Sequence, residues 1–256
     1  MVESDALNGQ GPTRNAVWRG VDFSGLAIVL GVGTGRLVKL LNRRAAASEG
    51  SLVVVSHELS RLKALVPLMQ EGPLALVHGR PGQIPVLSGV VDLLVVNGIL
   101  RQVAEDQLEA MFDELWRALV PGGLLRVSDV IEPSRAPYNL AWAERNRIVR
   151  KLAKSLGCPT ALSVDLQGAA TGLRNAGFED LHVSILPGYG LTDNWLQKTV
   201  NALRSMAARV VDRQVRNEIL GQDIDRLVGA YAQGGQRGAE RFVLQGTRAG
   251  DLALIM

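Results

Sequence analysis

The fold of this chain follows from the stretch Leu26-Ala-Ile-Val-Leu-Gly31-Val-Gly33-Thr-Gly35-Arg-Leu-Val38, which joins an apolar run, a glycine-rich turn and the start of an amphipathic segment. The apolar run, residues 26–30, predicts a strand covered on both faces, as in a parallel sheet. The glycines allow tight backbone conformations and let a ligand lie against bare main chain, beside the free N–H groups at a helix start. The stretch therefore predicts a strand, a ligand-binding turn and a helix in succession.

Outward from this stretch, short β-branched runs alternate with longer amphipathic segments, which is typical of an α/β fold. Further strands are predicted at 51–56, 74–78, 91–96, 123–130, 181–186 and 240–245, and helices at 36–47, 60–71, 105–119, 142–156 and 165–176. Between 191 and 235 apolar residues recur every three or four positions, which predicts two or three helices inserted before the last strand. We expect a lead-in segment, 1–24, and one domain, 25–256, that includes the insertion 191–235.

Composition places the chain among ordinary globular proteins, because 47% of its 256 residues are hydrophobic and 21% are charged. The single cysteine, Cys158, cannot form an intrachain disulfide, and three histidines offer no Cys/His zinc spacing. We therefore expect no metal site and a reducing, cytoplasmic location. The acidic N-terminus and the short apolar runs predict neither a signal peptide nor a membrane span.

The formal net charge of +3 arises from one part of the chain. Residues 191–249 hold nine Lys and Arg against six Asp and Glu, which accounts for the whole excess. Because the acids are interspersed with the bases, the pattern favours a solvated helix surface over a nucleic-acid-binding face.

The glycine spacing separates two families of nucleotide-binding folds. The dinucleotide fingerprint needs its third glycine at position 36, where this chain has Arg36. The spacing Gly31, Gly33, Gly35 instead resembles motif I of the Rossmann-like methyltransferases that use S-adenosylmethionine (SAM). In Val53-Val-Val-Ser-His57-Glu58, the acid ends the second strand, where a carboxylate can accept hydrogen bonds from both ribose hydroxyls. The competing interpretation of Glu58 is an acid favoured by a helix dipole.

Three later segments extend the resemblance in the correct order. Val91-Asp-Leu-Leu-Val-Val-Asn97-Gly98 resembles the family's fourth strand, whose end meets the methionine part of SAM. The segment Leu115 to Asp129, with Pro121-Gly122-Gly123, resembles the helix, turn and fifth strand, and Asn175-Ala-Gly177-Phe178 resembles the turn into the penultimate strand. The resemblance implies a three-layer sheet of order 3-2-1-4-5-7-6 with an antiparallel seventh strand.

The resemblance also implies a cofactor site at the glycine loop and at the ends of strands two to four. Its expected members are Gly31, Val32, Gly33, Thr34, Gly35, Glu58, Leu59, Gly79, Arg80, Asn97 and Gly98. Two positions depart from the family pattern. The acid usual two residues before the first glycine is Val29, and the acid common after the third strand is Arg80.

The implied activity is in-line transfer of a methyl group from SAM to a small-molecule acceptor, for which the protein mainly aligns the reactants and excludes water. A general base is needed only for an acceptor that is protonated at neutral pH, and the sequence singles out no catalytic residue. Acceptor binding is expected after strands five and six, because open α/β sheets bind ligands at the carboxyl ends of their strands. The candidates are Tyr138, Trp142, Arg145, Tyr189 and Trp195. Alternatively, the aromatic residues pack the helical insertion against the sheet.

Two other functions stay open at this stage. Val29 and Arg80 are compatible with a catalytically impaired, methyltransferase-like binding or scaffold protein. The isoelectric point of 9.3 raises an RNA or DNA methyltransferase, but Asn97-Gly98 lacks the Asn/Asp-Pro-Pro-aromatic pattern of amino-directed enzymes of that kind, so a nucleic-acid partner is not expected. The sequence is also compatible with a homo-oligomer.

Overall fold

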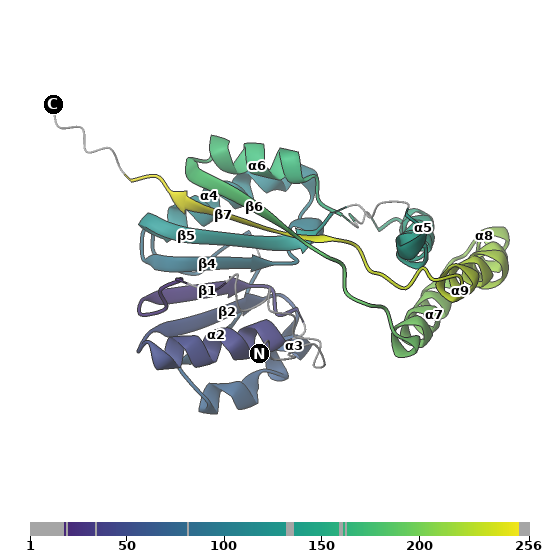
Figure 1. Cartoon of the computed structure of the whole chain (residues 1–256), viewed down its shortest axis with the longest axis horizontal. Helices are drawn as coiled ribbons and strands as arrows, with labels where there is room; N and C mark the ends of the chain where they lie inside the picture. Colours follow the sequence, from purple (N-terminus) through teal and green to yellow (C-terminus); the bar gives the residue numbers. More distant parts are fainter. Residues whose placement is uncertain are drawn as a thin grey trace, which may run out of the picture.

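The computed structural model describes residues 18, 20–33, 35–80, 82–131, 136–158, 161 and 163–250. Its centre is a seven-stranded sheet of order β3-β2-β1-β4-β5-β7-β6 (Figure 1). The strands are β1 (Leu26–Leu30), β2 (Ser51–Ser56), β3 (Leu74–His78), β4 (Val91–Asn97), β5 (Leu119–Val130), β6 (Phe178–Leu186) and β7 (Arg241–Arg248). The first five pair in parallel, whereas β7 runs antiparallel to both β5 and β6. The predicted order and the antiparallel last strand are confirmed.

Side-chain alternation along the central strands builds a core on each face of the sheet. In β1, Ile28 and Leu30 face one core while Ala27 and Val29 face the other, and all four are at most 1% exposed. The first core is closed by α4 (Leu108–Ala118) and α6 (Leu166–Asn175), the second by α2 (Arg36–Ala47). The result is the predicted three-layer α/β arrangement, with both faces of the inner strands covered.

Element boundaries differ from prediction where local chemistry interrupts a pattern. The single helix expected over 60–71 is wrong: α3 (Leu59–Lys63) ends early, and a separate 3-10 turn follows over Val66–Gln70. Pro67 explains the break, because proline has no N–H to donate and clashes with the preceding helical turn. The strand expected from 123 begins at Leu119, so the Pro121-Gly122-Gly123 segment lies within β5, where the register with β4 shifts.

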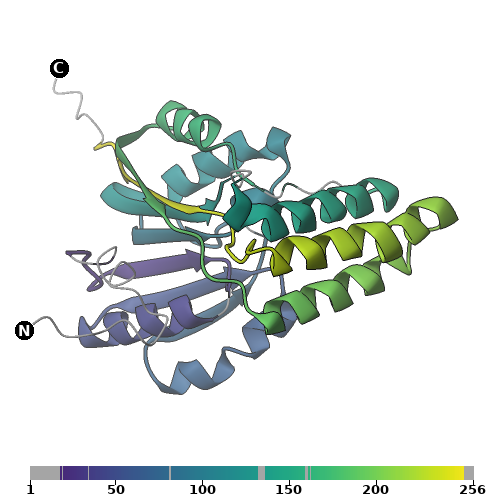
Figure 2. The same ribbon diagram turned by 45° about the vertical axis from the view of Figure 1, so that its right-hand side comes forward.

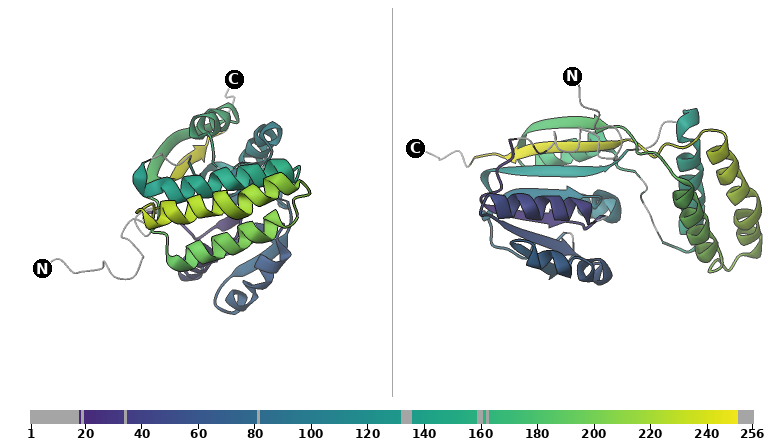
Figure 3. Two further views of the ribbon diagram at one scale, coloured as in Figure 1. Left: turned by 90° about the vertical axis from the view of Figure 1, so that its right-hand side faces the viewer. Right: turned by 60° about the horizontal axis from the view of Figure 1, so that its bottom comes forward.

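The remaining helices form a layer of their own at the carboxyl ends of the parallel strands (Figures 2 and 3). This helical layer consists of α5 (Leu140–Ser155), α7 (Asp193–Ala207), α8 (Arg213–Glu218) and α9 (Ile224–Ala232), with a π-helical turn over Ile219–Asp223. Its core includes Ile148, Leu203, Ile219 and Leu227, each at most 2% exposed. The insertion therefore packs mainly on α5, a helix that precedes it by almost 40 residues.

A buried carboxylate ties the two parts of the helical layer together. Asp223, whose side chain is 0% exposed, pairs with Arg147 at 2.8 Å and with Lys151 at 3.0 Å. Both bases lie on α5, one helical turn apart, and face the π-helical turn. Burial raises the pKa of Asp223, but the hydrogen bonds from Arg147 and Lys151 outweigh burial and hold it below its ordinary value. Among the described residues, no helix is both long and apolar enough to cross a membrane.

Candidate functional site

The glycine loop has the backbone geometry that its sequence predicts. Gly31, Gly33 and Gly35 have φ values of +90°, +53° and +77°, in the region that favours glycine. The Gly31 N–H donates to the carbonyl of Val55 at 3.2 Å, which ties the loop to β2. Gly35 then forms the N-terminal cap of α2. The loop therefore runs from the carboxyl end of β1 to a helix N-terminus, where main-chain N–H groups favour polar or anionic ligands.

Asn97, at the carboxyl end of β4, packs directly against this loop. A Cβ on Gly33 would lie 2.7 Å from the Asn97 side-chain nitrogen, and a Cβ on Gly31 would lie 2.5 Å from the Asn97 carbonyl oxygen. The Asn97 Oδ1 accepts a hydrogen bond from the Ser128 hydroxyl at 3.1 Å, and the Gly98 N–H donates to the Ser128 carbonyl at 2.8 Å. Asn97 and Gly98 thus join the loop to the end of β5, and an alanine at Gly31 or Gly33 would displace them.

Glu58 follows β2 on the neighbouring side of the loop. Its backbone N–H donates to the Ser56 hydroxyl at 3.1 Å, and its Oε2 pairs with the Arg61 Nε at 2.6 Å. Arg61 also donates from Nη1 to the Gly33 carbonyl at 3.1 Å. A carboxylate offers about four acceptor positions, so Glu58 can accept further hydrogen bonds while Arg61 holds it beside the loop.

The other predicted cofactor residues lie around this centre. Val32 is 5% exposed and packs in the core, so it can contribute only main chain to a site. Leu59 is 49% exposed at the start of α3. Gly79 donates to the Ser56 carbonyl at 3.1 Å, and Arg80 is exposed beyond it. Thr34 lies outside the described residues.

Val29 occupies the position where the family usually has an acid. Its side chain is 0% exposed and lies in the core between β2 and β4, in register with Val54 and Val95. No polar group is available from this position. Arg61 and Asn97 are the polar side chains that hold the loop instead, and they come from different elements.

The far side of the site begins with an ion pair at the carboxyl end of β5. The Arg101 Nε donates to the Asp129 Oδ1, which also accepts from the Val130 N–H. The Asp129 side chain is 0% exposed, and within the described part of the chain its Oδ2 has no hydrogen-bond partner. Burial raises the pKa of Asp129, and the opposing charge of Arg101 lowers it only in part, so the net direction is upward.

The predicted acceptor residues gather where the sheet meets the helical layer. The Trp142 ring meets Tyr189 edge-on at 5.9 Å and stacks on Trp195 at 6.0 Å, and Trp195 stacks on Tyr231 at 6.4 Å. Tyr138 lies under the guanidinium of Arg237, at 5.7 Å. Trp142 and Tyr231 are each 8% exposed, whereas Tyr138 and Tyr189 are each 45% exposed. The stacked rings therefore help to pack the helical layer, and Tyr138 and Tyr189 at its border stay partly exposed.

Arg145 belongs to the same cluster. Its guanidinium lies 5.5 Å from the centre of the Trp142 ring and donates to the Asn146 Oδ1 at 2.9 Å. Burial, followed by the charge of Arg101, lowers the pKa of Arg145. Burial also raises the pKa of Tyr189, although Arg145, Arg241 and Arg101 oppose that rise. The charges of the three arginines therefore favour the ionised form of Tyr189, and burial opposes it.

Sequence reasoning missed Arg61, Arg101 and Asp129. Arg61 could have been found, since it lies one helical turn after Glu58 and can reach back to it. Arg101 and Asp129 carry no local signal, because they are 28 residues apart and their side chains meet only through the pairing of β4 with β5.

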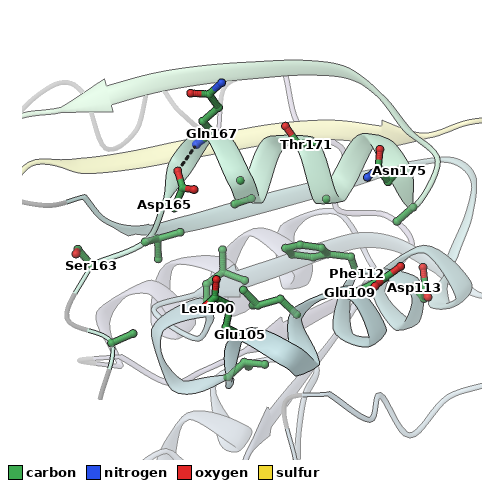
Figure 4. Close-up of a pocket in the computed structure, with 18 residues that line it drawn as sticks. Leu100, Glu105, Glu109, Phe112, Asp113, Ser163, Asp165, Gln167, Thr171 and Asn175 are labelled. Carbon is green, nitrogen blue, oxygen red and sulfur yellow. Dashed lines mark hydrogen bonds between the residues drawn. The ribbon is translucent and has the colours of Figure 1, made fainter. Parts of the chain in front are cut away.

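A separate surface pocket of about 760 Å³ lies between α4 and α6 (Figure 4). Its floor includes Phe112 and Ala169, and its rim includes Glu105, Glu109 and Asp165. None of the predicted cofactor or acceptor residues lines it. Among the described residues, no three His, Cys, Asp or Glu side chains gather in a way that could hold a metal ion.

Comparison with known proteins identifies the part of the chain that carries this site. Residues 28–127 match the family model described as "Methyltransferase domain". The match covers the glycine loop, Glu58, Asn97 and Arg101. No curated protein matches the chain.

Solved structures share the whole fold at low sequence identity. Phosphoethanolamine N-methyltransferase 2 from Haemonchus contortus, in complex with phosphomonomethylethanolamine and S-adenosylhomocysteine, has a TM-score of 0.54 at 14% identity, over 93% of this chain and 53% of that one. The YcgJ protein from Bacillus subtilis has a TM-score of 0.56 at 12% identity, over 88% and 92%. The [4+2]-cyclase SpnF has a TM-score of 0.55 at 15% identity, over 88% and 74%.

The Haemonchus contortus enzyme is described in complex with S-adenosylhomocysteine and, in a second structure, with S-adenosyl-L-methionine. The polar groups of this chain that surround the loop, Glu58 and Asn97, fit an adenosyl ribose and an amino-acid group. Residues 28–127 therefore match a methyltransferase domain, and the chain shares the seven-stranded, Rossmann-like fold of solved methyltransferase structures.

Proposed function

We propose that this chain is a methyltransferase that uses S-adenosylmethionine (SAM) and transfers its methyl group to a small-molecule acceptor by in-line displacement. The observation that carries the proposal is the convergence of two groups of residues at one edge of the sheet. The glycine loop, Glu58 and Asn97 lie at the carboxyl ends of β1, β2 and β4, and the Arg101–Asp129 pair lies beside Gly98 at the end of β5. The helical layer stands across the same edge (Figure 3).

Each residue has a definite part in this proposal. Glu58, held by Arg61, accepts hydrogen bonds from the ribose hydroxyls, and the main chain at Gly31, Gly33 and Gly98 borders the amino-acid end of the cofactor. SAM supplies an activated methyl group, so the chain needs mainly to align the acceptor and exclude water. The predicted acceptor residues Tyr138, Trp142, Arg145, Tyr189 and Trp195 are retained as candidates for that role.

The helical layer supports a small acceptor in preference to a nucleic acid. Arg147 and Lys151, two of the bases on α5, form ion pairs with Asp223. Their charges are therefore already compensated, which disfavours this helix face as a binding surface for nucleic-acid phosphates. Arg216 is similarly occupied, because its Nη1 donates to the Val210 carbonyl at 3.2 Å. We also propose a cytoplasmic location, because a chain with one cysteine has no need of an oxidising compartment.

Titration calorimetry with SAM and S-adenosylhomocysteine tests the cofactor site. The wild-type chain is expected to bind both, and Glu58→Gln is expected to weaken binding about tenfold or more, since a charge-assisted hydrogen bond is worth roughly 1.5–3 kcal/mol. Glu71→Gln is the matched control, because Glu71 is an exposed acid paired with Lys39 at 3.4 Å, after α3 and away from the loop. No detectable binding at millimolar protein, or equal losses in both variants, would contradict the proposed site.

Measuring the formation of S-adenosylhomocysteine distinguishes an enzyme from a protein that only binds SAM. SAM bound to the wild-type chain is expected to yield S-adenosylhomocysteine when a suitable small acceptor is added, with one methylated product per turnover. A chain that binds SAM and never forms S-adenosylhomocysteine across a broad acceptor panel would instead be a methyltransferase-like binding protein. Salt-sensitive oligonucleotide binding would point to a nucleic-acid acceptor.

A further inference from the structure

Arg145 and Tyr189 both contact the Trp142 ring, Arg145 over its face at 5.5 Å and Tyr189 edge-on at 5.9 Å. Two further arginines, Arg101 and Arg241, act on the same tyrosine through their charge. Arg101 follows β4, Arg145 lies on α5 and Arg241 begins β7. All three are close enough to the Tyr189 hydroxyl to influence its ionisation, and Arg101 also influences Arg145. Positive charges gathered in a partly buried place repel one another and lose hydration. Asp129 offsets the charge of Arg101, so the free-energy cost that a bound negative group would offset here is that of Arg145.

Arg101 is held in a fixed orientation at this place. Its Nε is engaged by the fully buried Asp129, and its two terminal nitrogens take no part in that hydrogen bond. One of them, Nη2, lies 3.6 Å from where a Cβ on Gly98 would be. Gly98 ends β4, so Arg101 stands at the border between the proposed cofactor site and the acceptor side.

Arg145 has no carboxylate partner among the described residues. Its contacts are the neutral Asn146 amide and the face of the Trp142 ring. The neighbouring bases on the same helix differ, because Arg147 and Lys151 both pair with Asp223. Arg145 is therefore the partly buried cation of α5 whose charge is left for a ligand.

We propose that this cluster binds an anionic group of the methyl acceptor, a carboxylate or a phosphate, with Arg145 as its main ligand and Arg101 beside it. A guanidinium presents five donors in a planar fork that matches either anion. The Tyr189 ring, which is 45% exposed and meets Trp142 edge-on at 5.9 Å, offers an apolar surface for the rest of the acceptor. This inference rests on the proposed function and names the chemical class of its acceptor.

The test is an NMR titration of the full ¹⁵N-labelled chain with three probes of similar size: benzoate, phenyl phosphate and benzamide. Each is added with and without saturating S-adenosylhomocysteine, and the Trp142 indole signal reports on the cluster. At least one anion is expected to bind about tenfold or more tightly than benzamide, since a charge-assisted contact has that strength. The ratio of the two anion affinities says whether the site is suited to a carboxylate or to a phosphate.

Three variants show which residue produces the preference. Arg145→Met keeps the length of the side chain and removes its charge, so the anion preference is expected to disappear while the affinity for S-adenosylhomocysteine stays within about twofold. Arg145→Lys is expected to retain part of the preference. Lys154→Met is the matched control, because Lys154 is exposed on the same helix. This variant is expected to prefer the anions over benzamide as strongly as the wild-type chain does.

The outcomes separate this inference from the proposed function. Equal binding of the three probes by the wild-type chain, or an anion preference that survives Arg145→Met, would overturn the inference. Loss of S-adenosylhomocysteine binding in Arg145→Met, with the anion preference intact, would overturn it as well and assign Arg145 to the cofactor. If the wild-type chain prefers anions but does not bind S-adenosylhomocysteine, the proposed function fails and the anion site stands.

Discussion

Arg61 contacts both halves of the proposed cofactor site. Its Nε pairs with Glu58 and its Nη1 donates to the Gly33 carbonyl, so one side chain fixes the acid and the loop relative to each other. Val29, where the family usually has a carboxylate, is sealed in the core and cannot do this. The loop is thus stabilised from α3, a different element from the one that the family pattern uses.

Replacing Arg61 is expected to weaken SAM binding even though Arg61 is not proposed to touch the cofactor. Arg61→Met should lower the affinity about threefold to tenfold, because exposed ion pairs are worth up to about 1 kcal/mol and the loop also loses a hydrogen bond. Calorimetry measures the change. Lys63→Met, an exposed base on the same helix, should bind as the wild type does; an unchanged affinity in Arg61→Met would show that the loop does not depend on it.

Glu114 and its partner Arg117 connect α4 to the segment between β3 and β4. Glu114 receives two hydrogen bonds from Arg117, at 2.6 and 2.9 Å, and one from the Ile84 N–H at 2.8 Å. Arg117 in turn donates to the carbonyls of Ile84 and Val86. The pair therefore clamps α4 to the segment between β3 and β4. The side-chain hydrogen bond from Arg117 is the main cause that lowers the pKa of Glu114.

The lowered pKa of Glu114 makes part of the stability depend on pH. A carboxylate with a depressed folded-state pKa stabilises the protein above its unfolded pKa of about 4.5, and the contribution is lost as the pH falls below that value. Glu114→Gln should lower the free energy of unfolding by about 1–2 kcal/mol at pH 7 and by less at pH 3. Urea unfolding at both pH values measures it, with the exposed Glu109→Gln as control; an equal loss at both values would contradict the assignment.

At this scale, the sequence predicted the residues whose role depends on local spacing. The glycines and Asn97 follow strand ends, so their meeting at one edge of the sheet follows from the parallel topology. Arg101 and Asp129 could not be predicted, because nothing in either neighbourhood indicates that two strands bring them together.

Elements were predictable where burial repeats along the sequence. The first three strands match their predicted bounds, since continuous apolar runs between turn residues have few alternative structures. The helix prediction was wrong across Pro67, because the apolar spacing continues there but proline prevents the backbone from continuing as an α-helix. Periodicity also could not show that α5 packs on α7 and α9, because an amphipathic helix does not specify which surface covers it.

Asp223 connects the π-helical turn to α5 through Arg147 and Lys151. Its replacement should therefore destabilise the packing of whole helices as well as remove these two ion pairs. Asp223→Asn should lower the free energy of unfolding by about 2–3 kcal/mol, below the usual 3–5 kcal/mol for a broken buried pair, because Arg147 and Lys151 keep Glu144 and Glu218 as partners. Hydrogen exchange should accelerate in α5 and α9. Asp225→Asn, an exposed acid in the first turn of α9, is the control; unchanged exchange in α5 would contradict the anchoring role.

The whole molecule has two parts with separate hydrophobic cores. The sheet has a core on each face, whereas the helical layer has its own, which meets the sheet mainly through Val130 at the end of β5 and Ala239 before β7. Figure 1 shows the layer joined to the sheet by a few connecting segments. Packing of this kind makes the layer a cooperative unit in its own right.

Native-state hydrogen exchange should therefore distinguish the two parts. Amides of α5, α7 and α9 are expected to share one opening free energy, lower than that of the central strands β1, β4 and β5. Adding S-adenosylhomocysteine should protect the strands and the loop more than the helical layer. A single opening free energy across both parts would show that the molecule unfolds as one unit.

The pairing of Leu186 with Arg241 places the exit and the return of the chain side by side. Everything between them, more than fifty residues, is in topological terms the loop of a hairpin whose strands stay in register whatever that loop contains. Loops tolerate exchange of length and content far better than the strands that carry them. The segment 187–240 can therefore be exchanged for another while the pairing of β6 with β7 is kept.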